Sequence, residues 1–212
     1  MDFPLETILL GAVPVVLAIT LHEAAHGYVA RMFGDHTAWM LGRVTLNPLK
    51  HIDPVGTVLI PALLLLIGAP FVFGWAKPVP VNFGNLRNPK ADMFWVAAAG
   101  PGSNFLQALA WAVVFKLAVA GVAPSPALAE MARIGLIANL ALMALNLLPV
   151  PPLDGGRIAV SLLPHRAAAA LARMEPYGLF VIVLLLATGV LGRLMQPLMF
   201  GAERLIAALI SL

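Results

Sequence analysis

The sequence contains no cysteine and few charged residues, and each shortage excludes a class of protein. Without cysteine, the 212-residue chain has no disulfide bonds, no thiolate metal ligands and no cysteine nucleophile. Only 11% of the residues are charged, whereas about 25% is usual in a soluble domain, and 61% are hydrophobic. So few charges cannot cover a globular surface in water. We therefore expect an integral membrane protein whose exterior faces a lipid bilayer.

The basic residues are spread through short loops and leave a net charge of +3. Basic residues in short loops orient a membrane protein, because cytoplasmic loops carry an excess of Lys and Arg. This distribution favours a multi-pass protein of the cell membrane and argues against a nucleic-acid partner. No pattern in the sequence indicates an oligomeric state.

Long apolar stretches alternate with loops rich in proline and glycine along the chain. The stretches cover residues 5–33, 54–73, 93–122, 127–148, 177–191 and 197–212. We expect an all-α polytopic membrane protein that forms a single domain over residues 1–212, with three core helices and further re-entrant or peripheral segments. An interfacial helix is expected over residues 157–173. A short extended strand is expected near residues 78–83, where prolines disfavour a helix.

The first apolar stretch contains the pattern H-E-x-x-H, formed by His22, Glu23 and His26. On a helix, residues four apart stand on one face, so both imidazoles can reach one zinc ion. Glu23 can then take a proton from the zinc-bound water, whose pKa the metal lowers to about 7. Ionisable residues at membrane depth are costly and mark functional sites. The pattern predicts a zinc metalloprotease with one Zn²⁺ ion, two histidine ligands and Glu23 as the catalytic base.

A catalytic zinc site needs a third protein ligand. Asp154 follows an apolar segment directly, after a proline-rich stretch at 149–152 that cannot continue the helix. Non-helical backbone at membrane depth is tolerated where it is buried in protein or lines a cavity, so this carboxylate can turn inward. A helix-ending Asp-Gly turn at the interface is the alternative interpretation. Because two histidines need a partner, the sequence favours Asp154 as the third ligand.

These features make the sequence resemble the site-2 proteases, a family of intramembrane zinc metalloproteases. The matching elements are residues 22–26, Gly-Pro-Gly-Ser-Asn at 100–104, and residues 146–155. The resemblance implies that Asp154 completes the zinc ligands and that Asn104 and Asn146 lie near the site, where they bind substrate or stabilise the oxyanion. Hydrogen bonding between helices is the alternative role for both asparagines. The chain resembles the short branch of the family, without PDZ or CBS domains.

The function implied by the resemblance is hydrolysis of peptide bonds in or near transmembrane segments of membrane-protein substrates, as in regulated intramembrane proteolysis. The segment 78–83 is expected to pair with an unwound substrate strand. A metal transporter is an alternative, but it has little need for Glu23 between the histidines. A transporter also spreads polar residues along a pathway, and this sequence does not.

The zinc ligands also constrain the membrane topology. The two histidines lie near the exit of the first helix, and Asp154 lies after the segment 127–148, so both exits must face one side of the membrane. This requires residues 54–73 to form a re-entrant hairpin instead of a crossing. The basic loops on either side of the hairpin are then cytoplasmic. We expect the N-terminus outside the cell and the active site nearer the cytoplasmic face.

Overall fold

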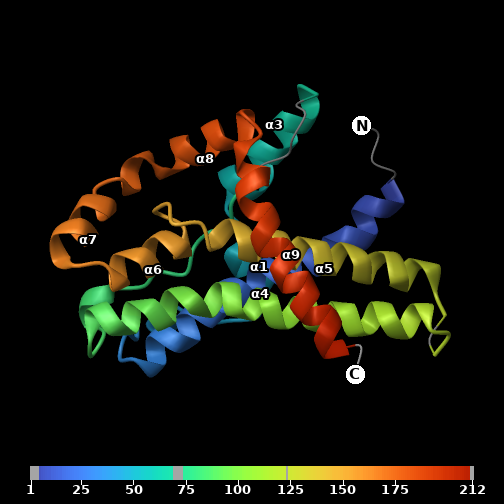
Figure 1. Cartoon of the computed structure of the whole chain (residues 1–212), viewed down its shortest axis with the longest axis horizontal. Helices are drawn as coiled ribbons and strands as arrows, with labels where there is room; N and C mark the ends of the chain where they lie inside the picture. Colours follow the sequence, from blue (N-terminus) through green and yellow to red (C-terminus); the bar gives the residue numbers. More distant parts are fainter. Residues whose placement is uncertain (1–4, 69–73, 123, 211–212) are drawn as a thin grey trace.

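The protein is described by a computed structural model over residues 5–68, 74–122 and 124–210, and these residues are largely helical (Figure 1). The α-helices are α1 (Leu5–Met32), α2 (Thr37–Met40), α3 (Ile60–Leu66), α4 (Pro89–Val119), α5 (Pro126–Asn146), α6 (Asp154–Leu162), α7 (His165–Ala172), α8 (Gly178–Ala187) and α9 (Val190–Ile210). Short helical turns lie between them: η1 (Pro48–His51), η2 (Pro54–Leu59), η3 (Phe83–Asn85) and η4 (Glu175–Tyr177). The prediction of an all-α fold is confirmed.

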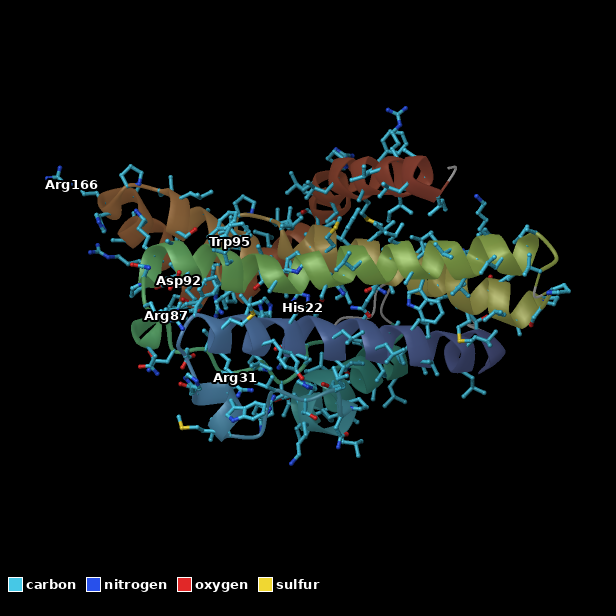
Figure 2. The ribbon with its side chains drawn as sticks, turned by 90° about the horizontal axis from the view of Figure 1, so that it is seen from below. His22, Arg31, Arg87, Asp92, Trp95 and Arg166 are labelled. Atoms are coloured by element: carbon cyan, nitrogen blue, oxygen red, sulfur yellow. The ribbon has the colours of Figure 1, made fainter. Side chains whose placement is uncertain are left out.

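Three long helices, α1, α4 and α5, form the core of the fold. α4 and α5 run side by side, and α1 packs against both (Figures 1 and 2). Ala18 on α1, Ala108 on α4 and Ala132 on α5 are completely buried where the helices meet. Small side chains let helices approach closely, which is a common basis of packing in membranes. The three predicted core helices are thus present.

Four helical segments are long and apolar enough to cross a membrane, namely Leu9–Met32, Pro89–Val119, Pro126–Asn146 and His165–Ala187. Large hydrophobic side chains on them point outward, such as Leu106 at 65% exposure and Phe180 at 70%. Such exposure suits a surface that faces lipid. The chain is therefore a membrane protein, as predicted. The C-terminal helix α9 packs on α5 and contributes the buried Ile206 to the core.

The apolar segment after the first loop, expected as a re-entrant hairpin over 54–73, is flanked by residues that bond to each other. It begins as η2 and α3, which together are shorter than the membrane-capable helices, and its last residues, 69–73, lie outside the described residues. On the return, the N–H of Trp75 donates to the carbonyl of Gly56 at 3.0 Å, and the N–H of Lys77 donates to that of His51 at 2.9 Å. The residues on either side of this segment therefore lie together.

Two expectations about local structure differ from the structure. The segment expected as a strand near 78–83 has no strand partner, and among the described residues no β-strand forms. Pro78 and Pro80 lack the N–H groups that a ladder requires. The single interfacial helix expected over 157–173 is two helices, α6 and α7. Pro164 separates them, because proline holds the preceding Leu163 in an extended conformation.

Candidate metal centre

Three titratable side chains meet where α1, α4 and α6 pack together. His22 and His26 stand one turn apart on α1, and Asp154 is the first residue of α6. All three are buried, with 7%, 9% and 7% of their surface exposed. Figure 2 shows His22 between the ribbons of α1 and α4, away from both ends of these helices. The three predicted ligands are therefore brought together inside the bundle.

The candidate ligand atoms form a nearly equilateral triangle. His22 Nε2 lies 3.1 Å from His26 Nε2. Asp154 Oδ2 lies 3.2 Å from the first nitrogen and 3.3 Å from the second. A tetrahedral zinc ion with bonds of about 2.0–2.1 Å holds its ligand atoms about 3.3–3.4 Å apart. The spacing therefore fits one zinc ion with three protein ligands.

A hydrogen bond at Nδ1, the ring nitrogen on the outer side, fixes the tautomer of each histidine. His26 Nδ1 lies 2.7 Å from the carbonyl oxygen of Val96, which can only accept, so Nδ1 carries the proton. His22 Nδ1 lies 2.6 Å from Asn104 Oδ1. Asn104 Nδ2 donates to the carbonyl of Ala18 at 3.2 Å, so the amide oxygen is the atom that faces His22. Both histidines thus carry the proton on Nδ1, as ligating histidines do when an outer partner orients them.

The two Nε2 atoms and Asp154 Oδ2 consequently point their lone pairs toward one another. When both rings are neutral, neither Nε2 carries a proton, and Asp154 Oδ2 is buried with no hydrogen-bond partner among the described residues. Three acceptor atoms so close together, with no proton between them, repel one another. A bound cation removes this repulsion, and two imidazoles with one carboxylate are a ligand set that suits zinc.

Gly100 on α4 leaves the space that such an ion needs. A Cβ atom at this position would lie 2.6 Å from His22 Nε2 and closer still to His26 Nε2. The space in front of both nitrogens is therefore open because residue 100 has no side chain. Ligand types, spacing and space together fit a zinc ion.

The turn after α5 brings Asp154 back to the histidines. Gly155 and Gly156 lie directly against the backbone of this turn, and a Cβ at either position would collide with the backbone of Leu147 or Pro151. Glycine allows this close approach. The start of α6, and the carboxylate of Asp154 with it, is thereby held against α4.

Comparison with known proteins assigns the family. The profile of peptidase family M50 matches residues 120–189, a range that includes α5 to α8. YwhC of Bacillus subtilis (strain 168), which is named as a zinc metalloprotease, is 37% identical over 214 aligned residues that cover 99% of this chain and 94% of YwhC. The chain belongs to peptidase family M50, the site-2 protease family.

Two further relatives of this M50 protease are named Rip2 and are also described as zinc metalloproteases. Rip2 of Mycolicibacterium smegmatis is 33% identical over 84% of this chain and 66% of its own length. Rip2 of Mycobacterium tuberculosis H37Rv is 33% identical over 81% of this chain and 62% of its own length. No solved structure matches the chain. The family and the relatives make this protein a zinc metalloprotease, as the sequence predicts.

Glu23 lies beside the ligands and contacts an extended segment of the M50 protease. Its Oε2 accepts a hydrogen bond from the backbone N–H of Val79 at 2.7 Å. The side chain of Val79 is buried and packs with Ala38 and Val44. The segment predicted to lie near the site therefore does so, through a backbone group that no side-chain pattern could reveal.

Asp35, just beyond α1, holds the same segment further along. Its carboxylate accepts hydrogen bonds from the N–H of Asn82 at 2.7 Å and the amide of Asn85 at 3.1 Å. The hydroxyl and N–H of Thr37 donate to it as well. Burial by itself raises the pKa of Asp35, but the hydrogen bonds, led by those from Thr37, outweigh it and hold this pKa below its usual value. Two carboxylates thus anchor one extended segment along α1.

The asparagines of the site differ in their contacts. Asn104 bonds to His22, as described above, whereas the amide nitrogen of Asn146 donates to the carbonyl of Leu142 in the preceding turn at 3.0 Å. Asn139 was not predicted, yet its Oδ1 accepts a hydrogen bond from Asn104 Nδ2 at 2.9 Å. The available signal was a polar residue in the middle of an apolar membrane helix.

Proposed function

We propose that this M50 protease hydrolyses peptide bonds in or near transmembrane segments of other membrane proteins, as a single membrane-embedded domain. One observation carries the proposal: three metal-binding side chains converge, buried, between helices long and apolar enough to cross a bilayer. A soluble substrate has no need of a site at this depth. A transmembrane helix hides its carbonyl groups in hydrogen bonds, so the substrate must unwind locally before hydrolysis.

His22, His26 and Asp154 are the proposed zinc ligands. When bound, zinc supplies a Lewis acid that lets a water molecule lose its proton near neutral pH and polarises the substrate carbonyl. The Nδ1 hydrogen bonds of the two histidines hold both rings with Nε2 directed inward. These bonds keep the ligand lone pairs free of protons.

Glu23 is the proposed general base. Its Oε2 is held by the N–H of Val79, which leaves Oε1 to receive the proton from the attacking water. The same carboxyl group can then pass the proton to the amine of the leaving peptide. Fixing this flexible side chain beside the ligands supports the assignment, because a general base must stand within hydrogen-bond reach of its proton.

The two predicted asparagines have different proposed roles. Asn104 orients His22, which its 2.6 Å hydrogen bond supports. Asn146, at the end of α5 and before the turn that carries Asp154, is the proposed contact to the substrate or its oxyanion. The extended segment that contacts Glu23 is the proposed partner of the unwound substrate strand.

The proposed orientation places the N-terminus outside the cell and the zinc nearer the cytoplasmic face. His22 lies ten residues before the end of α1 at Met32, or about 15 Å along the helix. Arg31 and Arg87 lie at that same end of the molecule (Figure 2). Basic residues at one end of a membrane protein favour the cytoplasmic side.

Glu23→Gln tests the function directly. The purified variant should bind one zinc ion like the wild type but lose cleavage by about a hundredfold or more, since general bases contribute this much to rate. Cleavage is measured on a purified reporter protein with one transmembrane helix, in detergent micelles, and zinc by elemental analysis. Undiminished cleavage by Glu23→Gln would refute the assigned base. Absence of zinc from the wild type would refute the reaction class.

A further inference from the structure

A chain of buried amides leads away from the outer nitrogen of His22. Asn104 Oδ1 accepts from His22 Nδ1 at 2.6 Å, and Asn104 Nδ2 donates to Asn139 Oδ1 at 2.9 Å. Asn139 Nδ2 in turn donates to the carbonyl of Gly135 at 2.9 Å. Because a carbonyl oxygen can only accept, the last bond fixes the orientation of the Asn139 amide. The orientation of Asn104 follows from it.

Both amides are fully enclosed. Asn104 and Asn139 have 0% of their surface exposed, on neighbouring helices α4 and α5. A buried amide without partners costs free energy, and here each one has them. Asn104 uses its second N–H on the carbonyl of Ala18 at 3.2 Å. The chain therefore has one direction, with every donor aimed away from His22.

We propose that Asn139 is a positioning residue for the zinc site, acting through Asn104 to keep the proton of His22 on Nδ1. The inference rests on the proposed role of His22 as a zinc ligand. Asn139 Oδ1 attracts the nitrogen of the Asn104 amide and so turns its oxygen to His22. The opposite orientation of Asn104 would present N–H groups to His22 Nδ1 and drive the proton to Nε2. That proton would block the ligand lone pair.

A purely structural role for Asn139 is the competing explanation, since asparagines commonly join helices in membranes. Such a role predicts lower stability on substitution with unchanged zinc affinity. A positioning role predicts weaker zinc binding and an altered ligand geometry. The two are separated by measuring the metal itself, without any substrate.

The experiment compares two substitutions of Asn139 in the full-length protein in detergent. Asn139→Leu keeps the branched shape of the side chain and removes the acceptor for Asn104. Asn139→Asp is the conservative variant: in this apolar position the carboxyl stays neutral, so its carbonyl accepts from Asn104 and its hydroxyl donates to Gly135. Zinc affinity is measured by competition with a chromophoric chelator. The Co²⁺-substituted protein is examined by visible absorption, which reports on ligand geometry.

Asn139→Leu should bind zinc about tenfold more weakly, in the range known for outer partners of metal-bound histidines, and shift the Co²⁺ bands. Asn139→Asp should stay within about threefold of the wild type, below that range. Gln107→Leu is the matched control, because Gln107 lies on α4 and its amide approaches the same Ala18 carbonyl at 3.5 Å without contacting His22. It should leave affinity and spectrum unchanged.

Three results would overturn the inference: wild-type affinity and spectrum in Asn139→Leu, an equal loss in Gln107→Leu, or no rescue by Asn139→Asp. If Asn139→Leu does not fold, the smaller Asn139→Ala takes its place, because it also removes the acceptor for Asn104 and should show the same loss of affinity and the same spectral shift. His22→Ala separates this inference from the proposed function. If His22→Ala keeps full zinc affinity, the proposed ligand set fails. If His22→Ala loses zinc and Asn139→Leu does not, only the positioning role fails.

Discussion

The carboxylate of Glu23 accepts a hydrogen bond from the backbone N–H of Val79, with 2.7 Å between Oε2 and the nitrogen. The contact joins the proposed base to a segment 56 residues further along the chain. A glutamate side chain loses about 1.5–2 kcal/mol of rotamer freedom when it is fixed in one position. The backbone of the extended segment supplies part of the interaction that offsets this cost.

Removing the N–H of Val79 should therefore slow catalysis without removing the metal. Val79→Pro deletes this donor, because proline has no backbone N–H. We expect kcat to fall about tenfold, because fixing Glu23 again costs side-chain entropy, with unchanged zinc content. The measurement is cleavage of the transmembrane reporter at several substrate concentrations.

Val79→Ala is the control for that substitution, because it keeps the N–H and removes only the packing against Ala38 and Val44. Its kcat should stay close to that of the wild type. Equal losses in Val79→Pro and Val79→Ala would mean that the side chain, and not the hydrogen bond, matters. A faster Val79→Pro enzyme would show that the segment restrains Glu23 instead of orienting it.

The parts of the site that could be predicted are those with a local pattern. His22 and His26 are four residues apart, and helix geometry places such residues on one face. Asp154 was predicted because prolines break the preceding helix, a local effect whose consequence is long-range. The core helices were predicted from apolar length alone.

The rest of the site depends on contacts that have no sequence signature. Gly100 belongs to the Gly-Pro-Gly-Ser-Asn element, but the sequence does not show that its missing side chain leaves space in front of the histidines. Val79 acts through its backbone, so its side chain gives no indication. Asn139 stands out only as a polar residue in an apolar segment, and nothing in the sequence pairs it with Asn104, 35 residues away. The strand expected near 78–83 was inferred from the effect of proline on the residue before it, and this local effect provides no partner strand.

Replacing Asp35 with asparagine should loosen the extended segment at its far end. An amide cannot accept from all of Thr37, Asn82 and Asn85, so at least one donor loses its partner. Hydrogen bonds to charged groups contribute about 1.5–3 kcal/mol, and we expect the free energy of unfolding to fall by about that amount at neutral pH. Urea unfolding of the detergent-solubilised protein measures it.

The pH dependence of this loss distinguishes the charge from the shape of Asp35. Its pKa is lower in the folded protein than the ordinary value of 3.8. The carboxylate therefore contributes stability above that value, and the contribution is lost as the pH falls through the folded pKa. The difference between wild type and Asp35→Asn should be constant near neutrality and shrink below about pH 4. A difference that is the same at pH 3 and pH 7 would contradict the assignment.

The re-entrant hairpin expected over residues 54–73 predicts which loops share a side of the membrane. The chain has no cysteine, so single cysteines can be labelled without background. Cysteines at the exposed positions Lys50 and Asn88 should react with an impermeant maleimide from the same side. A cysteine at Val122, which is 73% exposed beyond the far end of α4, should react from the opposite side. Labelling of the first two from opposite sides would mean that the segment crosses.

Gly100 and Gly102 on α4 offer a matched pair for the space in front of the histidines. A Cβ at Gly100 would intrude between the two imidazoles, whereas a Cβ at Gly102 would meet nothing within 4 Å. Both changes to alanine favour the helix by about 1 kcal/mol, so helix stability is matched. Gly100→Ala should weaken zinc binding by about a hundredfold or more, beyond the effect of an outer partner, and abolish cleavage. Gly102→Ala should bind zinc like the wild type. Wild-type zinc affinity in Gly100→Ala would mean that the ion does not lie in front of His22 and His26, and the three-ligand centre would have to be abandoned.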